Sequence, residues 1–529
     1  MRFKLSPSFL LLGVLLTSQT GFETEAMAQL TDITQTPNTA GRGIALSLEQ
    51  QIGVGSGNVS TPDSSHYQIK RDPARAIRRG RQLFQRKFTR AQGQGPRTPT
   101  DGIGDIETIG ALGAGLADSC AACHGLPRGS AGFGGDVVTR PDGRNAPHLF
   151  GLGLKEQLAD EITRDLRALR DQALIDAAAS GVPEKIALKS KGISYGMLKV
   201  NPDGTVDTNR VKGIDPDLRV RPFFAQGGTI SIREFVVGAL SAEMGMQSAD
   251  PCLNAATTGG LCVTPSGMVL DGALDTIEAP PITDSSDDGD FDGVTDEVDP
   301  AVVDFLEFYL LNYFKPGSGE TDRATQEGFK LIKNIGCTRC HRADLKVDAD
   351  RRVADVETRF NPRKGQWNRL FATAETRFHT EDDGQALPLI LPNGDVFRVV
   401  NIFSDFKRHD LGPNFHELNY DGTIQKEFMT APLWGVGSTA PYGHDGRSIS
   451  LKEVILRHGG EANRSQQKFR RLSTHQQDQV LKALRSLILF PPDNTASNLN
   501  EGDPTTPGFP QFGQGKIDLS VLFSTPGPE

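Results

Sequence analysis

Two copies of the pattern Cys-x-x-Cys-His, at positions 120–124 and 337–341, constrain this chain more than any other feature. Two thiols three positions apart can each form a thioether with a haem vinyl group, and the adjacent imidazole then reaches the iron. A zinc site would need the ligands of both motifs to converge, and a redox-active thiol pair does not need the histidine. The motifs therefore predict two covalently bound c-type haems. The attachment residues are Cys120, Cys123, Cys337 and Cys340, and the proximal iron ligands are His124 and His341.

The first 28 residues have the pattern of a secretory signal peptide. Met1 to Lys4 carries two cations, Phe9 to Leu16 is apolar, and Ala26-Met27-Ala28 supplies the small residues of a cleavage site. The alternative, a short membrane anchor, is disfavoured because the apolar run is about half as long as a bilayer span. No later segment reaches roughly 18 consecutive apolar residues. We expect a soluble protein, periplasmic or otherwise exported, without a transmembrane segment in its mature chain.

The net charge limits the possible binding partners, and the two remaining cysteines predict a further covalent link. Lys and Arg number 57 and Asp and Glu 66, which gives a formal net charge of −9. An exposed nucleic-acid binding surface is therefore not expected. Cys252 and Cys262 lie ten residues apart and outside the two motifs. They predict a disulfide, which would restrict the unfolded chain by about 2.7 kcal/mol in the chain-entropy model, with two free thiols as the alternative.

Helical patterns and loop-rich stretches divide the chain into segments. The most apolar helix candidate, Val302–Phe314, is followed by Pro316 and Gly317, and we place the domain boundary there. Other helices are expected at Pro73–Lys87, Gln157–Ser180, Arg323–Ile335 and Thr474–Leu489. The expected order is a signal peptide (1–28), an N-terminal extension (29–70), a first haem domain with insertions and an Asp-rich loop (71–318), a second haem domain (319–490) and a Pro-rich tail (491–529).

The Asp-rich segment between the two motifs fits a twelve-residue calcium loop. Gly293 stands at the sixth position, where such loops turn sharply, and the twelfth position holds Asp in place of the usual Glu. Clustered carboxylates repel one another without a cation, so we expect Ca²⁺; a solvated acidic loop is the alternative. The expected ligands are Asp288, Asp290, Asp292, Asp296 and Asp299.

Several sequence segments resemble those of one protein family. They are Ser231–Phe235 with Glu243–Gly245, Ala431–Gly435 with Thr439–Gly446, and His458–Ala462. The chain is similar to the bacterial di-haem cytochrome c peroxidase superfamily, and within it to the branch of di-haem oxidoreductases and peroxidases, over roughly residues 75–490. The resemblance implies a mainly α fold of two c-type cytochrome domains with long loops and insertions, whose haems face a shared interface.

The resemblance assigns catalysis to the first haem. Glu243 matches the family's distal acid, which moves a proton as the O–O bond of peroxide breaks; a glutamate on a helix surface is the alternative. In the peroxidases a second histidine soon after the haem motif can cap the distal side, but here no histidine lies between Gly125 and Pro147. His148 is the only nearby candidate, and its place in the segment Asn145–His148 fits a different role, so we expect an open or water-bound distal side.

Two positions depart from the family pattern. Ala239 stands where relatives have a proline, and Ala225 where they have a tryptophan between the haems. Trp434 and Trp367 are the candidates to replace that tryptophan.

The resemblance makes the second haem the electron-transfer group. The peroxidases ligate it with a methionine fourteen residues beyond their Tyr-x-His motif, and here this offset leads to His458. Ligation by two histidines would give a lower potential than ligation by histidine and methionine. His409 and His416 are rival ligands, and an ordinary buried histidine is the remaining alternative.

A second, interdomain calcium is also implied. Thr439 and Pro441 match positions whose carbonyls bind Ca²⁺ in the peroxidases, and Asn145 matches the side-chain ligand. The alternative is that these segments are structural turns at the interface.

Three functions agree with these features. The leading one is reduction of hydrogen peroxide, or another small oxidant, at the first haem, with electrons from a small donor protein arriving through the second haem. The same scaffold could instead oxidise or oxygenate an organic or protein substrate. A pure electron carrier is the third reading, and an open iron site beside Glu243 disfavours it.

Overall fold

The computed structural model describes residues 47–95, 117–124, 135–136, 144–289, 292–313, 315–318, 321–360, 370–419 and 422–488. The expected signal peptide and Pro-rich tail lie outside these ranges, and the expected domain boundary stays a prediction. The structure is 39% helical and 15% strand. The expected mainly α fold of two cytochrome domains is therefore wrong, because segments that the sequence presents as irregular loops pair into short strands. The described strands form eight sheets of two or three strands each.

The first core lies around helix α10 (Pro300–Leu311), which is buried on nearly every side. It packs against α3 (Ser65–Arg71), α4 (Pro73–Gln85) and α8 (Ile232–Met244). At Gly80 of α4 a Cβ atom would lie 2.2 Å from the carbonyl oxygen of Phe305, so only glycine allows the two helices to approach this closely. The short helix α6 (Cys120–Cys123) contacts α4, and its two cysteines pack against the first core.

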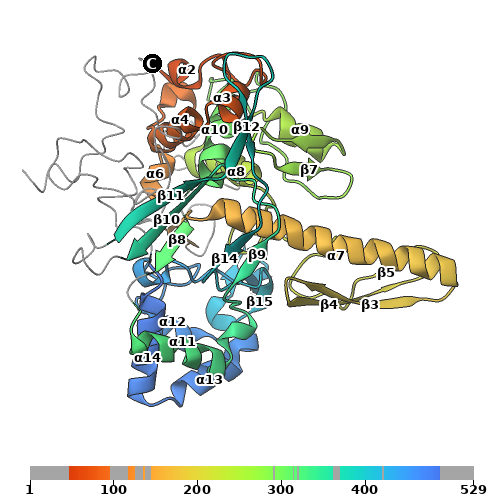
Figure 1. Ribbon diagram of the computed structural model, residues 1–529, viewed down its shortest axis with the longest axis vertical. Helices are drawn as coiled ribbons and strands as arrows, with labels where there is room; N and C mark the ends of the chain where they lie inside the picture. The colour runs from red at the N-terminus through yellow and green to blue at the C-terminus, as the bar shows by residue number, and fades with distance from the viewer. Residues whose placement is uncertain are drawn as a thin grey trace, which may run out of the picture.

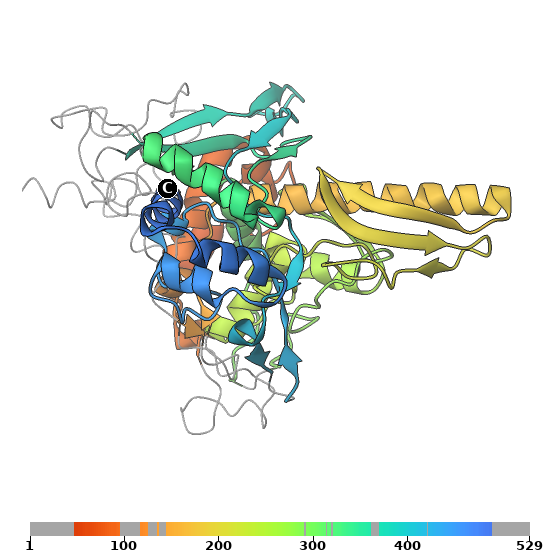
Figure 2. The same cartoon turned by 90° about the horizontal axis from the view of Figure 1, so that it is seen from below.

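An arm projects from the body of the molecule (Figures 1 and 2). It consists of the long helix α7 (Leu152–Ser180) and a three-stranded antiparallel sheet of β3 (Glu184–Ser190), β4 (Ile193–Val200) and β5 (Val206–Asp207). Along β4, residues Ile193, Tyr195, Leu198 and Val200 are buried, which gives the sheet an apolar face toward α7. We call this cluster the arm core; it continues into Trp434 and Ile402 of the C-terminal part.

The second core is helical and lies in the C-terminal part. Helix α11 (Arg323–Ile335) packs against α14 (Thr474–Arg485), with α12 (Leu451–Arg457) and α13 (Asn463–Arg470) beside them. A Cβ at Gly328 would lie 2.0 Å from the carbonyl oxygen of Gln479, so glycine permits the α11–α14 contact. Helices were expected at both positions, and both are present.

The remaining strands are short. A parallel pair, β8 (Lys315–Ser318) with β10 (Ala354–Phe360), is extended by β11 (Leu370–Thr376). The other pairs are antiparallel: β1 (Gly135–Asp136) with β2 (Arg144–Asn145), β6 (Leu261–Val263) with β7 (Val269–Asp271), β9 (Leu345–Val347) with β14 (Phe397–Val399), β12 (Phe378–Glu381) with β13 (Leu389–Pro392), β15 (Arg408–Asp410) with β18 (Glu427–Met429), and β16 (Glu417–Leu418) with β17 (Ile424–Gln425).

Two smaller helices complete the N-terminal part: α2 (Leu48–Ile52) and α9 (Pro251–Thr257). The disulfide Cys252–Cys262 joins α9 to β6, which confirms the prediction for this cysteine pair. None of the described helices combines the length and the apolar character that a membrane crossing requires.

The base of α7 connects the N-terminal and C-terminal parts. The carboxylate of Glu161 accepts hydrogen bonds from the main-chain N–H groups of Asp348, at 2.7 Å, and Ala349, at 3.1 Å. Gln157 Oε1 accepts from the N–H of Arg351 at 2.7 Å, and the Arg351 guanidinium pairs with Asp160 at 3.1 Å. The first turns of α7 therefore hold the segment 348–351 of the C-terminal part.

Candidate functional site

The first Cys-x-x-Cys-His motif forms one helical turn followed by its histidine. His124 follows α6, and its Nδ1 lies 2.8 Å from the carbonyl oxygen of Pro147. That carbonyl can only accept, so Nδ1 carries the proton and Nε2 presents its lone pair. Burial lowers the pKa of His124 to about 4, so the ring is neutral at neutral pH. A neutral imidazole with a fixed Nδ1–H is the form that binds a metal through Nε2.

The second motif repeats this arrangement. Gly336, with φ +97°, turns the chain from α11 into the 3₁₀ turn Cys337–Arg339. Nδ1 of His341 lies 2.9 Å from the carbonyl oxygen of Phe403, and burial lowers the pKa of this histidine. The two motifs thus orient their histidines in the same way from different parts of the chain.

The zinc alternative does not fit this geometry. Cys120 and Cys123 pack on the first core, whereas Cys337 packs on the second core, so the motifs do not converge. Burial raises the pKa of Cys120 to about 12 and that of Cys337 to about 11.

His458 has the same orientation as the two motif histidines. It follows directly after α12, and its Nδ1 lies 2.6 Å from the carbonyl oxygen of Val454. Burial lowers the pKa of His458 to about 4, and the nearby His341 adds to that decrease. The two rings are therefore close enough to interact electrostatically, and both are neutral.

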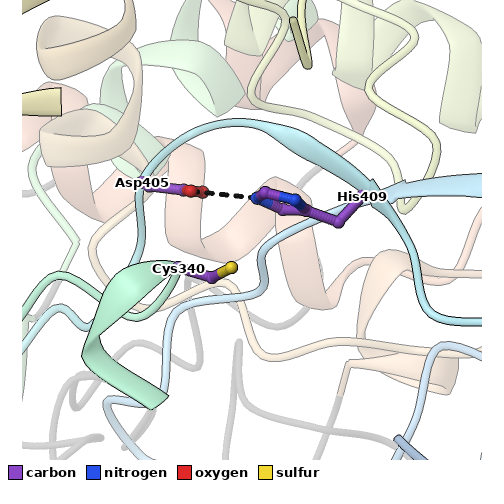
Figure 3. A group of neighbouring side chains, drawn as sticks. All are labelled: Cys340, Asp405 and His409. Carbon is purple, nitrogen blue, oxygen red and sulfur yellow. Dashed lines mark hydrogen bonds and ion pairs between the residues drawn. The ribbon is translucent and has the colours of Figure 1, made fainter. Parts of the chain in front are cut away.

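The rival histidines are held differently. His409 Nε2 lies 2.9 Å from Asp405 (Figure 3). Its Nδ1 lies 3.0 Å from Glu461, so both ring nitrogens are paired with carboxylates. Burial lowers the pKa of His409, but the hydrogen bonds and charge interactions with Asp405 and Cys340 together raise it to about 11. His416 is paired through Nε2 with Asp410 at 2.8 Å.

Figure 3 also shows the Cys340 sulfur beside this pair; ligand atoms of Cys340, Asp405 and His409 lie within 4.8 Å of one another. Both ring nitrogens of His409 are already bonded to carboxylates, so neither is left free to bind a metal beside Cys340. Among the described contacts of the three candidates for a second axial ligand, only those of His458 bond Nδ1 to a main-chain carbonyl, whereas His409 and His416 are paired with carboxylates.

Residues 367–487 match a family of di-haem oxidoreductases. Its description is "Di-haem oxidoreductase, putative peroxidase", and the match supports the branch that the sequence resembles. The matched segment begins after the second motif and contains His409, His416 and His458. The comparison with curated proteins gave no match.

Glu243, which the di-haem oxidoreductase resemblance singles out, lies in the last turn of α8 and is half-buried. Ser231 begins this helix with a capping box in which its hydroxyl accepts from the N–H of Glu234. Residues of α8, among them Val236 and Leu240, share the first core with the cysteines of α6. The helix that carries Glu243 and the first motif therefore lie in the same part of the molecule.

The carboxylates of the Asp-rich loop accept hydrogen bonds from the chain itself. Asp288 accepts from the N–H groups of Asp292, at 3.0 Å, and Gly293, at 2.9 Å. Asp299 accepts from Ala301 at 2.7 Å as the N-cap of α10, and Asp296 has a positive φ of 56°. Asp290 lies outside the described residues. Calcium binding by this loop stays a prediction.

The residues of the expected interdomain calcium site come together. Asn145 Nδ2 lies 3.3 Å from the carbonyl oxygen of Pro441, and the Asn145 N–H donates to the carbonyl of His444 at 2.8 Å. Thr439 lies in the same turn, directly after the 3₁₀ turn Val436–Ser438. The side chain of Asn145 and the carbonyl of Pro441, from the two parts of the chain, thus lie at one place, and the calcium ion itself stays a prediction.

Two contacts at this junction could not be predicted from the sequence. His148 Nε2 donates to the carbonyl oxygen of Trp434 at 3.1 Å. His444 Nε2 lies 3.0 Å from Oε1 of the buried Glu417, and the His444 ring stacks on Phe428 with centroids 3.9 Å apart. A proline lies shortly before both His148 and Trp434, but this shared feature does not predict a contact between residues that are 286 positions apart. Trp367, the other candidate tryptophan, lies outside the described residues.

Proposed function

We propose that this chain is an exported di-haem c-type oxidoreductase that reduces hydrogen peroxide, or another small oxidant, at a haem held by His124. Electrons would come from a small donor protein through a second haem held by His341 and His458. The observation that carries the proposal is an asymmetry between the two motifs. His341 has nearby a second neutral histidine, His458, whose Nδ1 is bonded to a main-chain carbonyl and whose Nε2 is left to face a metal. The neutral histidine near His124 is His148, which bonds a main-chain carbonyl through Nε2 instead.

When bound, the haems would supply one-electron redox chemistry and, at the first iron, a position for peroxide. The chain's own residues then have separate tasks. His124, His341 and His458 each donate their Nδ1 proton to a carbonyl and offer Nε2 to iron, and this arrangement fixes the ring plane. The two cysteines of each motif would bind the macrocycle covalently.

Glu243 is the proposed proton donor. Reduction of hydrogen peroxide follows H₂O₂ + 2 H⁺ + 2 e⁻ → 2 H₂O, so each turnover consumes two protons. A carboxyl group near the reacting oxygen can protonate the leaving hydroxide as the O–O bond breaks. Glu243 is only half-buried, so its carboxyl group can be reprotonated from solvent between turnovers.

We also propose two structural Ca²⁺ sites, one at the Asp-rich loop and one between Asn145 and the Thr439–Pro441 turn. Oxygen donors only, from carboxylates, an amide and carbonyls, are the ligands that Ca²⁺ prefers. The second site would join the N-terminal and C-terminal parts next to the contact between Asn145 and Pro441.

A second candidate function is oxidation of an organic or protein substrate on the same scaffold. Two observations favour it: Ala225 stands where the peroxidases have their tryptophan, and the α7 arm projects from the body, where a macromolecule could contact it (Figure 2).

Stopped-flow spectroscopy tests the proposal directly. The purified holoprotein is mixed with H₂O₂, with and without a reduced small donor protein, and haem absorbance and donor oxidation are followed. We expect a rapid Soret change with H₂O₂ and catalytic donor oxidation. A variant with Cys120→Ala and Cys123→Ala should lose the peroxide response, whereas Cys337→Ala with Cys340→Ala should keep it and lose donor oxidation.

An unchanged spectrum after H₂O₂ would make the protein an electron carrier. A spectral response without donor oxidation, together with oxidation of an added organic or protein substrate, would favour the second candidate function.

A further inference from the structure

One hydrogen bond joins the histidine loop of the first motif to the C-terminal part of the chain. His148 directly follows Pro147, whose carbonyl anchors the ring of His124 at 2.8 Å. The His148 ring in turn donates through Nε2 to the main-chain carbonyl of Trp434 at 3.1 Å. The residue that orients the first histidine is therefore one peptide bond away from a direct contact with the other part of the molecule.

The bonded contacts continue to the second motif. The residue before Trp434, Leu433, donates its N–H to the carbonyl of Ile402 at 3.0 Å. The next residue, Phe403, provides the carbonyl that anchors the ring of His341 at 2.9 Å. Four hydrogen bonds and short pieces of main chain thus form a continuous path from the ring of His124 to the ring of His341.

The middle of this path is buried and closely packed. Trp434 is 2% exposed and Ile402 is fully buried. Gly151, three residues after His148, has φ +74°, and a Cβ there would lie 2.8 Å from the indole of Trp434. The indole therefore lies against the main chain that follows His148. Hydrogen bonds in such a water-poor interior are held in one geometry.

His148 is itself suited to a fixed donor role. Burial lowers its pKa to about 3, so the ring is neutral, and the contact with the Trp434 carbonyl places its proton on Nε2. The ring also packs edge-on against Phe150, with centroids 6.3 Å apart. The donor ring is thus held on one side by Phe150 and on the other by the carbonyl it bonds.

We propose that the His148–Trp434 hydrogen bond is the link through which electrons pass between the two haem-binding histidines. The inference rests on the proposed function only in requiring both haems to be bound. Each event moves one electron, supplied by the reduced donor protein, from the centre held by His341, which is oxidised, to the centre held by His124, which is reduced. His148 keeps its proton throughout. Electrons tunnel more readily along bonded atoms than across a van der Waals gap, so breaking this link should slow the transfer.

Three single substitutions test the link in the haem-loaded protein. His148→Phe keeps a ring against Phe150 but removes the donor, and His148→Gln keeps an amide donor near the position of Nε2. Trp434→Phe keeps the main-chain carbonyl, and it breaks no indole hydrogen bond among the described residues, because Trp434 Nε1 has no partner there. The second haem is reduced by a flash-excited reductant without peroxide, and the transfer to the first haem is followed by absorbance. Both haem potentials and the thermal midpoint are measured for each variant.

We expect His148→Phe to slow the transfer by about an order of magnitude at unchanged potentials, while His148→Gln and Trp434→Phe stay near the wild-type rate. A wild-type rate in His148→Phe at equal driving force would overturn the proposal, and so would a slow rate in Trp434→Phe alone, which would assign the transfer to the indole. Because the measurement uses no peroxide, a protein that fails to reduce H₂O₂ but shows this pattern would refute the proposed function and leave the inference standing.

Discussion

Arg233 offers a quantitative test of how the helix that carries Glu243 is held in place. Its guanidinium contacts Asp250 at 2.6 Å, Asp304 at 2.8 Å and Glu307 at 3.1 Å, and all four side chains are at most 2% exposed. Arg233→Met would fill most of the same volume but leave buried carboxylates without their cation. Removing one partner of a buried ion pair costs about 3–5 kcal/mol. We expect this loss of unfolding free energy at pH 8.

The pH dependence of the loss gives a second check. Burial raises the pKa of Glu307, and Arg233 works against that increase. A carboxyl whose pKa is raised in the folded state binds more protons folded than unfolded, so its contribution to stability falls as pH rises from about 4.3 upward. Without Arg233 the pKa rises further. The substitution should therefore cost less at pH 5, where the carboxyl can be protonated, than at pH 8.

Chemical denaturation at both pH values, followed by far-ultraviolet circular dichroism, measures these differences. The control is Arg398→Met, which removes a guanidinium that is 72% exposed and paired with Asp344 at 2.6 Å. Exposed pairs contribute less than about 1 kcal/mol. Adding Asp304→Asn to Arg233→Met should recover part of the loss. A cost below about 1 kcal/mol for Arg233→Met, or an equal cost at pH 5 and pH 8, would refute the reasoning.

Three further predictions concern the proposed haem sites. The denatured wild-type chain should keep both haems, and the double variant Cys337→Ala with Cys340→Ala should keep one, as mass spectrometry of the unfolded protein would show. His458→Met should raise the potential of the second haem in a redox titration because a thioether replaces an imidazole. The control variant His409→Gln should keep the low-spin spectrum of the second haem, and loss of that spectrum in His409→Gln would make His409 the ligand in place of His458. Glu243→Gln should lower peroxide turnover by roughly 10²–10⁴-fold, measured at matched haem content; an equal rate would remove Glu243 from the active site.

The helices were predictable because their signals are local. Apolar residues at helical spacing indicated Arg323–Ile335, and the structure has a helix with those bounds. The apolar run at Val302–Phe314 likewise marked α10, which begins two residues earlier, at Pro300. The disulfide was predictable for a similar reason, since two cysteines close in sequence remained once the motifs were assigned.

The strands were not predictable, and the fold class was therefore wrong. Segments such as Leu345–Val347 and Phe397–Val399 are three residues long and pair with partners some fifty positions away. Three residues are too few to establish an alternating pattern. Their pairing is decided by main-chain hydrogen bonds and by the core beneath them, neither of which leaves a local signal.

The candidate site likewise has a part that local sequence patterns predict and a part that they do not. The motif histidines and His458 could be named from spacing and resemblance, whereas their distinction from His409 depends on contacts with Asp405 and Glu461 that only the folded chain reveals. The contact of His148 with Trp434 joins residues 286 positions apart and depends on a main-chain carbonyl, which every residue possesses. The residue types at these two positions therefore do not predict the contact.

The base of α7 has a consequence for the electron transfer proposed above. One continuous helix starts four residues after His148 and bonds the segment 348–351 within its first turns. The segment that follows the first motif is therefore joined to residues 348–351, downstream of the second motif, by a continuous helix and partly buried hydrogen bonds. A change of oxidation state that separated these two segments would have to break the contacts of Gln157 and Glu161. If both haems are bound as proposed, these contacts would hold their separation, and the rate of electron transfer would be set by the groups around and between the two centres.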